Sequence, residues 1–121
     1  MKRIVIVNED WDFCQRYRKV LQKEGFLVET FLDGKVGLTH ILAQKPELVI
    51  LGLMLPTLNG FDILRVLREK ETTKKIPVIV CSRLQGEELE ELEDFSVVAF
   101  FHKSTCTPEI LLEKVRELLG Y

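Results

Sequence analysis

Short runs of aliphatic residues alternate along the whole chain with segments of helical periodicity, and this alternation limits the possible folds most strongly. Residues 4–7 and 48–51 are apolar at every position, which is typical of strands buried on both faces of a parallel sheet. Between them, apolar residues recur every three or four positions, as Phe13, Tyr17 and Val20 do. The pattern therefore predicts an α/β fold with helical crossovers covering both faces of a parallel sheet.

The length and the order of these segments indicate one domain of alternating strands and helices. A chain of 121 residues with 46% hydrophobic residues is long and apolar enough to bury a single core. Thr107 and Pro108 are a typical N-cap and first helical residue for the last helix. The expected strands cover residues 4–7, 26–31, 48–51, 76–81 and 97–101, and the expected helices cover 12–24, 33–45, 61–70, 87–95 and 108–120.

Charge, cysteine content and apolar run length exclude several classes of protein. The 17 basic residues are balanced by 19 acidic ones, which argues against binding nucleic acid through bulk electrostatics. Cys14, Cys81 and Cys106 lack the spacing of a zinc site or a disulfide scaffold, so reduced thiols are expected. The apolar runs are too short for a signal peptide or a membrane span. We expect a soluble, cytoplasmic protein with no membrane contact.

The residues that directly follow each predicted strand are the candidates for a functional site. In an open parallel sheet, ligands bind beyond the carboxyl ends of the strands, where the strand order reverses. The first turn contains neither a GxGxxG nor a P-loop motif, so nucleotide binding through those motifs is not supported. The residues that follow the first, third, fourth and fifth strands are Asn8, Glu9, Asp10, Gly52, Ser82, Arg83, His102 and Lys103.

Four stretches of the chain, RIVIVNED, PELVILGLMLPTLNGFDILRVLR, IPVIVCS and FFHK, resemble the receiver domains of two-component response regulators. The resemblance runs from Lys2 to about Leu119. It implies a flavodoxin-like (βα)5 three-layer sandwich with a five-stranded parallel sheet in the order 2-1-3-4-5. It also implies that residues 1–121 form a single receiver-like domain, either alone or as the N-terminal part of a longer regulator.

The resemblance assigns roles to the residues at the strand ends. In the family, an acidic pair helps to hold Mg²⁺, and an aspartate at the end of the third strand accepts a phosphoryl group from a histidine kinase. A hydroxyl and a lysine then contact that phosphoryl group. The acidic pair falls on Asn8 and Glu9, the hydroxyl on Ser82, the lysine on Lys103, and the acceptor position on Gly52.

Gly52 decides the functional interpretation, because a residue without a side chain cannot form an acyl phosphate. Asn8 removes a second carboxylate, which leaves Glu9 and Asp10 as weak metal candidates and predicts weak or absent Mg²⁺ binding. Neither acid is expected to replace the acceptor. Arg83 follows Ser82 where the family usually has a small residue, and it is expected to cover the pocket or pair with Glu9. The sequence thus predicts a pseudo-receiver that has no catalytic residue, needs no cofactor and is not an enzyme.

The preferred function is a signalling module that binds proteins independently of phosphorylation. Its expected interaction face is built from the fourth helix, the fifth strand and the fifth helix, with Glu90, Glu91 and Phe101 as candidates. The expected partners are a fused or separate output domain, a kinase, or a second copy of the chain. Direct binding of nucleic acid by this domain is not expected.

Two other functions were weighed against it. Glu9, Ser82, Arg83 and Lys103 form a candidate site for a small anion or a phosphorylated metabolite. A Lys103–Glu9 contact that fills the pocket would argue against this alternative. For Ser82, a hydroxyl that only bonds the backbone is the structural alternative to a vestigial role in the pocket. Flavin binding is the weakest of the alternatives, because the first turn lacks a Ser/Thr/Gly-rich loop that could bind the flavin phosphate.

Overall fold

Five parallel strands form one sheet in the order β2-β1-β3-β4-β5 in a computed structural model that describes residues 1–84 and 86–120. The strand order and the alternation with helices confirm the predicted flavodoxin-like architecture. The strands are β1 (Arg3–Val7), β2 (Leu27–Phe31), β3 (Leu48–Leu51), β4 (Val78–Ser82) and β5 (Ala99–His102).

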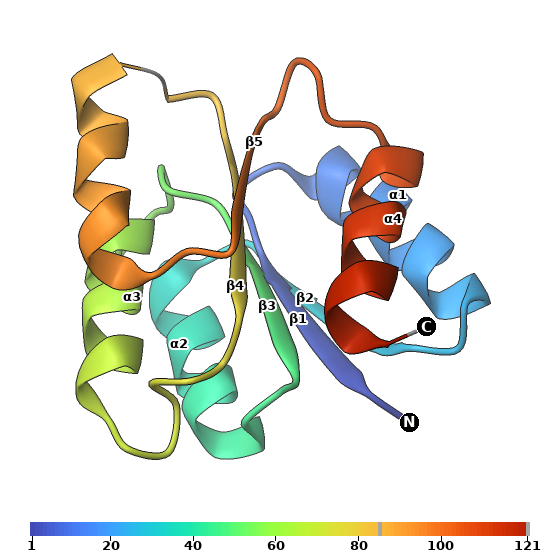
Figure 1. Cartoon of the computed structure of the whole chain (residues 1–121), viewed down its shortest axis with the longest axis horizontal. Coiled ribbons are helices and arrows are strands. Elements are labelled where there is room, and N and C mark those ends of the chain that lie inside the picture. Colours follow the sequence, from blue (N-terminus) through green and yellow to red (C-terminus); the bar gives the residue numbers. More distant parts are fainter. Residues whose placement is uncertain (85, 121) are drawn as a thin grey trace.

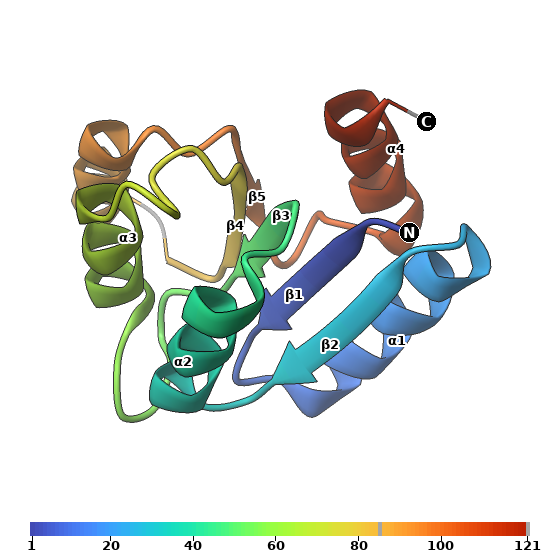
Figure 2. The same cartoon turned by 90° about the horizontal axis from the view of Figure 1, so that it is seen from below.

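The helices cover the two faces of the sheet in separate groups, so the molecule has three layers (Figures 1 and 2). One layer contains α1 (Trp11–Lys23) and α4 (Pro108–Leu119). The opposite layer contains α2 (Gly34–Gln44), α3 (Gly60–Glu69) and the 3₁₀ helix η1 (Gly86–Phe95).

Successive strand residues point into two different cores, which explains why the central strands are apolar throughout. Ile4 and Ile6 pack toward α1 and α4, whereas Val5 and Val7 pack toward α2 and α3. All four side chains are at most 1% exposed. Each buried aliphatic side chain stabilises the fold by about 1.5–3 kcal/mol, so this strand is fixed by packing on both faces.

Side-chain caps fix where the four α-helices begin, and Asp33 caps α2 through the backbone N–H of Val36. Asp10 accepts a hydrogen bond from the Phe13 backbone N–H and thereby caps α1. Thr107 caps α4 in the same way, and Pro108 follows it as the sequence predicts. Asn59 caps α3 through the backbone N–H of Asp62. These caps hold the loops at the carboxyl end of the sheet in defined positions.

Two glycines allow close backbone approach near the same end of the sheet. A Cβ on Gly37 would lie 2.7 Å from the methyl groups of Val7, so α2 packs directly on β1. A Cβ on Gly60 would lie 2.3 Å from the Gly52 carbonyl oxygen, and the Gly60 N–H donates to the Leu53 carbonyl oxygen at 3.0 Å. Gly60 therefore lets the loop after β3 turn tightly into α3.

The segment predicted as an ordinary helix at 87–95 is instead the 3₁₀ helix η1. A 3₁₀ helix has three residues per turn, so side chains three apart lie on one face. Leu89, Leu92 and Phe95 have this spacing, and all three pack against the core beside α3. The apolar spacing of the segment thus fits the tighter helix.

Strands β4 and β5 also begin two residues later than predicted. Pro77 has no N–H to donate to a neighbouring strand, which fits the start of β4 at Val78. Both strands also end one residue later than predicted, so Ser82 and His102 are the last residues of their strands and do not follow them. The two residues lie opposite each other in the sheet register.

Candidate functional site

The carboxyl ends of four strands bring the predicted site residues together at one edge of the sheet. Val7 pairs with Leu51 in the parallel register, and the Gly52 N–H donates to the Val7 carbonyl oxygen at 2.7 Å. The Lys103 N–H donates to the Ser82 carbonyl oxygen at 3.0 Å. The sheet thus holds the residues after β1, β3, β4 and β5 in a fixed arrangement.

Side chains from the first loop lie where a side chain on residue 52 would extend. A Cβ on Gly52 would lie 3.0 Å from Asn8 Nδ2 and 3.1 Å from Glu9 Oε1. These separations are tight for a carbon atom, so both neighbours would have to shift to admit a larger residue. Glu9 therefore reaches closer to the third strand than the sequence suggested.

Asn8 is completely buried, and most of its polar atoms form hydrogen bonds with other residues of the chain. Its backbone N–H donates to the Phe31 carbonyl oxygen at 3.0 Å, and its Oδ1 accepts from the Asp10 N–H at 3.0 Å. Its Nδ2 has no hydrogen-bond partner within residues 1–84 and 86–120. Because a buried donor without an acceptor is costly, an acceptor on residue 52 would be favourable at this point.

The Lys103 side chain is 6% exposed and lies between two carboxylates. Its Nζ is 3.5 Å from Glu9 Oε2 and 3.5 Å from Asp10 Oδ2, and it lies 5.2 Å from the Phe13 ring centroid. The Glu9 pairing was expected, whereas the Asp10 pairing was not. Two acids on one buried ammonium compensate for its desolvation.

Asp10 combines this ion pair with its role as the cap of α1. The hydrogen bond from the Phe13 N–H holds the pKa of Asp10 below its ordinary value, and the charge of Lys103 acts in the same direction. Burial opposes both effects. The carboxylate is thus held charged by the helix that it caps.

Of the two positions expected for Arg83, the structure shows no pairing with Glu9 among the described residues, and Arg83 instead lines the pocket beside Lys103. Arg83 Nη2 lies 3.9 Å from Asp10 Oδ2, and 72% of its side chain is exposed. Asp10 caps the helix beside it and is fixed in place, so it is the acid that a solvated guanidinium on the neighbouring loop reaches. Arg83 lies at the margin of the site.

Ser82 is buried, and its Oγ accepts a hydrogen bond from the Leu84 N–H at 3.2 Å. This backbone contact agrees with a structural role for the hydroxyl. The contact of Lys103 with Glu9 argues against the small-anion alternative, because it engages the ammonium that would bind the anion.

A side-chain link between two loops was missed by the sequence analysis. His102 Nδ1 accepts from the Ser104 N–H at 3.2 Å, and its Nε2 lies 3.1 Å from the Arg83 carbonyl oxygen. A neutral imidazole with its proton on Nε2 satisfies both contacts. Local sequence gives no signal for this link, because it depends on the pairing of β4 with β5.

The side chains at this end do not fit a Mg²⁺ site. Magnesium requires oxygen ligands, usually one or two carboxylates with water and phosphate. Here Glu9 and Asp10 face Lys103, Gly52 contributes no side chain, and Asn8 turns its nitrogen toward residue 52. Over the described part of the chain, no three His, Cys, Asp or Glu residues gather as a metal cluster would require.

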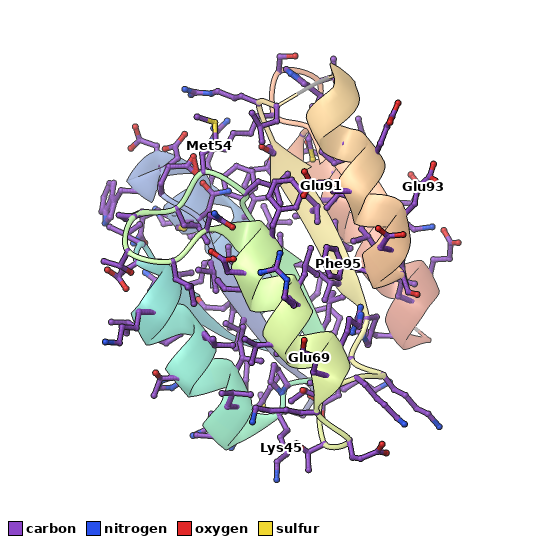
Figure 3. The ribbon with its side chains drawn as sticks, turned by 90° about the vertical axis from the view of Figure 1, so that its left-hand side faces the viewer. Lys45, Met54, Glu69, Glu91, Glu93 and Phe95 are labelled. Carbon is purple, nitrogen blue, oxygen red and sulfur yellow. The ribbon has the colours of Figure 1, made fainter. Side chains whose placement is uncertain are left out.

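The predicted interaction face contains exposed acids and a shallow apolar hollow. Glu90 and Glu91 are exposed on η1, whereas Phe101 is half-buried against the core beneath α1 and α4. Figure 3 shows Glu93 on the outer side of η1 and Phe95 on the side that faces α3. The residues that line the hollow between η1 and β5 are Leu89, Leu92, Glu93, Val97 and Phe100.

Among residues 1–84 and 86–120, each helix is too short or too polar to cross a lipid bilayer.

Comparison with known proteins agrees with this architecture. The chain is 31% identical over 121 residues to the phosphate regulon transcriptional regulatory protein PhoB of Rhizobium meliloti (strain 1021), covering 98% of this chain and 52% of that protein. It thus spans about half the length of that curated relative. The structure of a BeF3-activated DrrB receiver domain is 29% identical, with a TM-score of 0.87, and the match covers 100% of this chain and 99% of that one.

The chemotaxis response regulator CheY4 of Vibrio cholerae has the same fold, with a TM-score of 0.88 at 22% identity over 98% of each chain. The model of the response regulator receiver domain matches residues 4–116. That match includes every strand end described above and all but the last turn of α4. This chain is a member of the response regulator receiver domain family, whose members act in two-component signal transduction.

Proposed function

We propose that this receiver domain is a protein-interaction module whose signalling state does not depend on phosphorylation. The observation that carries the proposal is Gly52 at the family's acceptor position, with Asn8 and Glu9 in the space beside it. Formation of an acyl phosphate needs a carboxylate oxygen that attacks phosphorus. Residue 52 offers only backbone atoms, so this reaction has no nucleophile there.

The neighbouring acids are poor substitutes in this account. Glu9 lies closest to residue 52, yet its carboxylate also faces Lys103 at 3.5 Å. Asp10 is engaged by the N-terminus of α1. The chain therefore acts without an enzymatic step, needs no cofactor, and binds Mg²⁺ weakly or not at all.

The proposed docking surface consists of η1, β5 and α4. Glu90 and Glu91 are exposed on η1, and Glu93 lines the hollow beside Phe100, so the surface combines negative charge with an apolar centre. A basic partner, an output domain, a kinase or a second copy of the chain would fit it. Several relatives are named as DNA-binding response regulators and are longer than this chain, which supports an output domain outside it. The domain itself would act in the cytoplasm without touching nucleic acid or membrane.

The test is phosphorylation followed by intact-mass measurement. The protein is incubated with acetyl phosphate and Mg²⁺, or with its cognate kinase, and is expected to gain no phosphoryl group. A stoichiometric adduct that maps to Glu9, Asp10 or another acid would overturn the proposal. The Gly52→Asp variant, treated in parallel, is the matched control that restores a carboxylate at the acceptor position.

A further inference from the structure

Two helices on opposite sides of the molecule carry opposite charge. The α1 segment contains four basic residues and one acid, whereas η1 contains six acids and no basic residue. Figures 1 and 2 show α1 in blue and η1 in orange on opposite faces of the sheet. The two sets of charges therefore cannot neutralise each other within one molecule, but they can meet between two molecules.

Neither helix pairs these charges with its own surroundings. Elsewhere on the surface, exposed charges form local ion pairs, as Arg65 does with Asp62 and Lys74 with Glu71, both at 2.8 Å. Within residues 1–84 and 86–120, no ion pair includes an exposed base of α1 or an exposed acid of η1. These residues are Arg16, Lys19 and Lys23 on α1 and Glu90, Glu91, Glu93 and Asp94 on η1.

The basic surface of α1 includes an exposed aromatic side chain. Trp11, the only tryptophan of the chain, begins α1 and is 59% exposed. Arg16 and Lys19 lie about 8 and 12 Å further along the helix, since each residue advances about 1.5 Å. All three residues line one shallow depression on the surface. Tryptophan and arginine are the residue types most enriched among those that dominate the binding energy of protein interfaces.

The acidic surface of η1 includes a place for such a side chain. The hollow between η1 and β5 has a volume of about 220 Å³. It is lined by Glu93 and by four apolar residues, which are Leu89, Leu92, Val97 and Phe100. The apolar lining would cover an indole ring, and the acids of η1 would face the basic residues that follow the tryptophan.

We propose that the chain associates head to tail with a second copy of itself. Trp11 of one copy occupies the hollow beside η1 of the other copy, and the bases of α1 face the acids of η1. The opposite charges, left unpaired in the described part of the chain, carry this inference together with the exposed tryptophan and the apolar hollow. The inference rests on the proposed docking surface and names the partner of that surface.

A head-to-tail contact has a consequence that a symmetric dimer lacks. The two contacting surfaces are different parts of the molecule, so each end of a pair keeps one of them free. Association therefore continues to longer oligomers or closes a ring. Because the charges are exposed, salt weakens the contact. Protein concentration, rather than phosphorylation, would then set the assembly state.

The first measurement uses the wild-type chain and its single tryptophan. Light scattering gives the mass, and intrinsic fluorescence reports the environment of Trp11, over a range of protein concentrations. The mass should rise beyond that of a dimer while the emission shifts to shorter wavelength. Both changes should reverse in about 1 M salt, where the Debye length is about 3 Å. A monomeric mass throughout, or growth with unchanged tryptophan emission, would overturn the proposal.

Two variants, each with one disabled surface, test the direction of the contact. The η1 variant combines Glu90→Gln, Glu91→Gln and Glu93→Gln, and the α1 variant combines Trp11→Ala with Lys19→Gln. All five side chains are exposed, so both variants should fold. Each variant alone should associate at least about tenfold more weakly than the wild type. An equimolar mixture should form a one-to-one complex and grow no further, because only one intact contact remains.

The same variants separate this inference from the proposed docking surface. Dimers of the α1 variant, with none of the η1 variant, would show that the docking surface pairs with itself, and would overturn only the head-to-tail contact. Wild-type association of both variants would overturn the contact and the docking surface together. Lys74→Gln is the matched control, because it removes an exposed charge that is already paired with Glu71, and it should associate as the wild type does.

Discussion

The interior of the sheet and the carboxyl ends of the same strands differ in how much of the receiver pattern they retain. Inside, β1 and β3 present apolar side chains to both faces, and nearly all of them are completely buried. At the strand ends, the family's acid positions hold Asn8 and Gly52. This difference indicates that packing maintains the fold, and that the acids at the family's phosphoryl-transfer positions are not needed for it.

The remaining residues at the strand ends have structural partners. Asp10 caps α1, Ser82 bonds the backbone of its own loop, and Lys103 balances Glu9 and Asp10. These contacts hold the loops together even where no phosphoryl group binds. We therefore expect changes in the interior to affect stability most and changes at the strand ends to affect it least.

The largest loss of stability is expected from truncation in the centre of the sheet. Ile50→Ala removes a completely buried side chain from β3 and should lower the free energy of unfolding by about 2–5 kcal/mol. Urea denaturation followed by circular dichroism measures the change. A loss below about 1 kcal/mol would show that this core tolerates cavities. It would contradict the view that the interior of the sheet contributes more to stability than the strand ends.

Two glycines at the same end of the sheet should respond differently to alanine. Gly60→Ala forces a Cβ to within 2.3 Å of a backbone oxygen and should cost about 1–3 kcal/mol. Gly52→Ala meets side-chain atoms at 3.0 and 3.1 Å, which can move, and should cost less than about 1 kcal/mol. Equal losses in the two variants would contradict the view that the fold requires Gly60 and not Gly52.

The cap at Asp10 should have an intermediate effect that depends on pH. Asp10→Ala removes the side-chain acceptor for the Phe13 N–H and should cost about 1 kcal/mol. Asp10→Asn is the matched control, because asparagine also caps helices but carries no charge.

Because the folded pKa of Asp10 lies below its ordinary value of 3.8, its charge stabilises the fold above that value. This contribution is lost as the pH falls through the folded pKa. Denaturation at a series of acid pH values should show the loss in the wild type and a smaller one in Asp10→Asn. The same acid sensitivity in both proteins would assign the effect to other groups.

The smallest change in stability is expected on the proposed docking surface. Replacement of Glu90 and Glu91 by lysine alters exposed side chains and should change the free energy of unfolding by no more than about 0.5 kcal/mol. Partner binding or self-association, measured by light scattering or calorimetry, should nevertheless weaken. Unchanged association would show that the docking surface does not include η1.

Most elements of the fold have a strong local signal in the sequence, whereas the strand order followed from the resemblance to receiver domains. The fully apolar strands predicted a sheet covered on both faces, and Thr107 with Pro108 marked the start of the last helix. The cap at Asp10 was not predicted. The 3₁₀ form of η1 was missed, because the spacing of Leu89, Leu92 and Phe95 fits a short helix of either kind when no packing is known. The later start of β4 at Val78 was missed for a similar reason, although Pro77 carried a signal.

The site was predicted residue by residue, but several of its contacts were not. The Lys103–Glu9 pair follows from the convergence of strand ends, whereas Arg83 reaches Asp10 only because Asp10 is fixed by the cap. Such contacts join distant segments, and local periodicity contains no information about them.

The central claim is that the end of β3 lacks the group that would make this domain a phosphorylation switch. The most direct measurement is a titration of the isotopically labelled wild-type chain with beryllofluoride and Mg²⁺, followed by backbone amide NMR. We predict no saturable shift at Gly52, Ser82 or Lys103. Saturable shifts at all three residues would mean that the pocket accepts a phosphoryl mimic together with its metal, and would contradict the account.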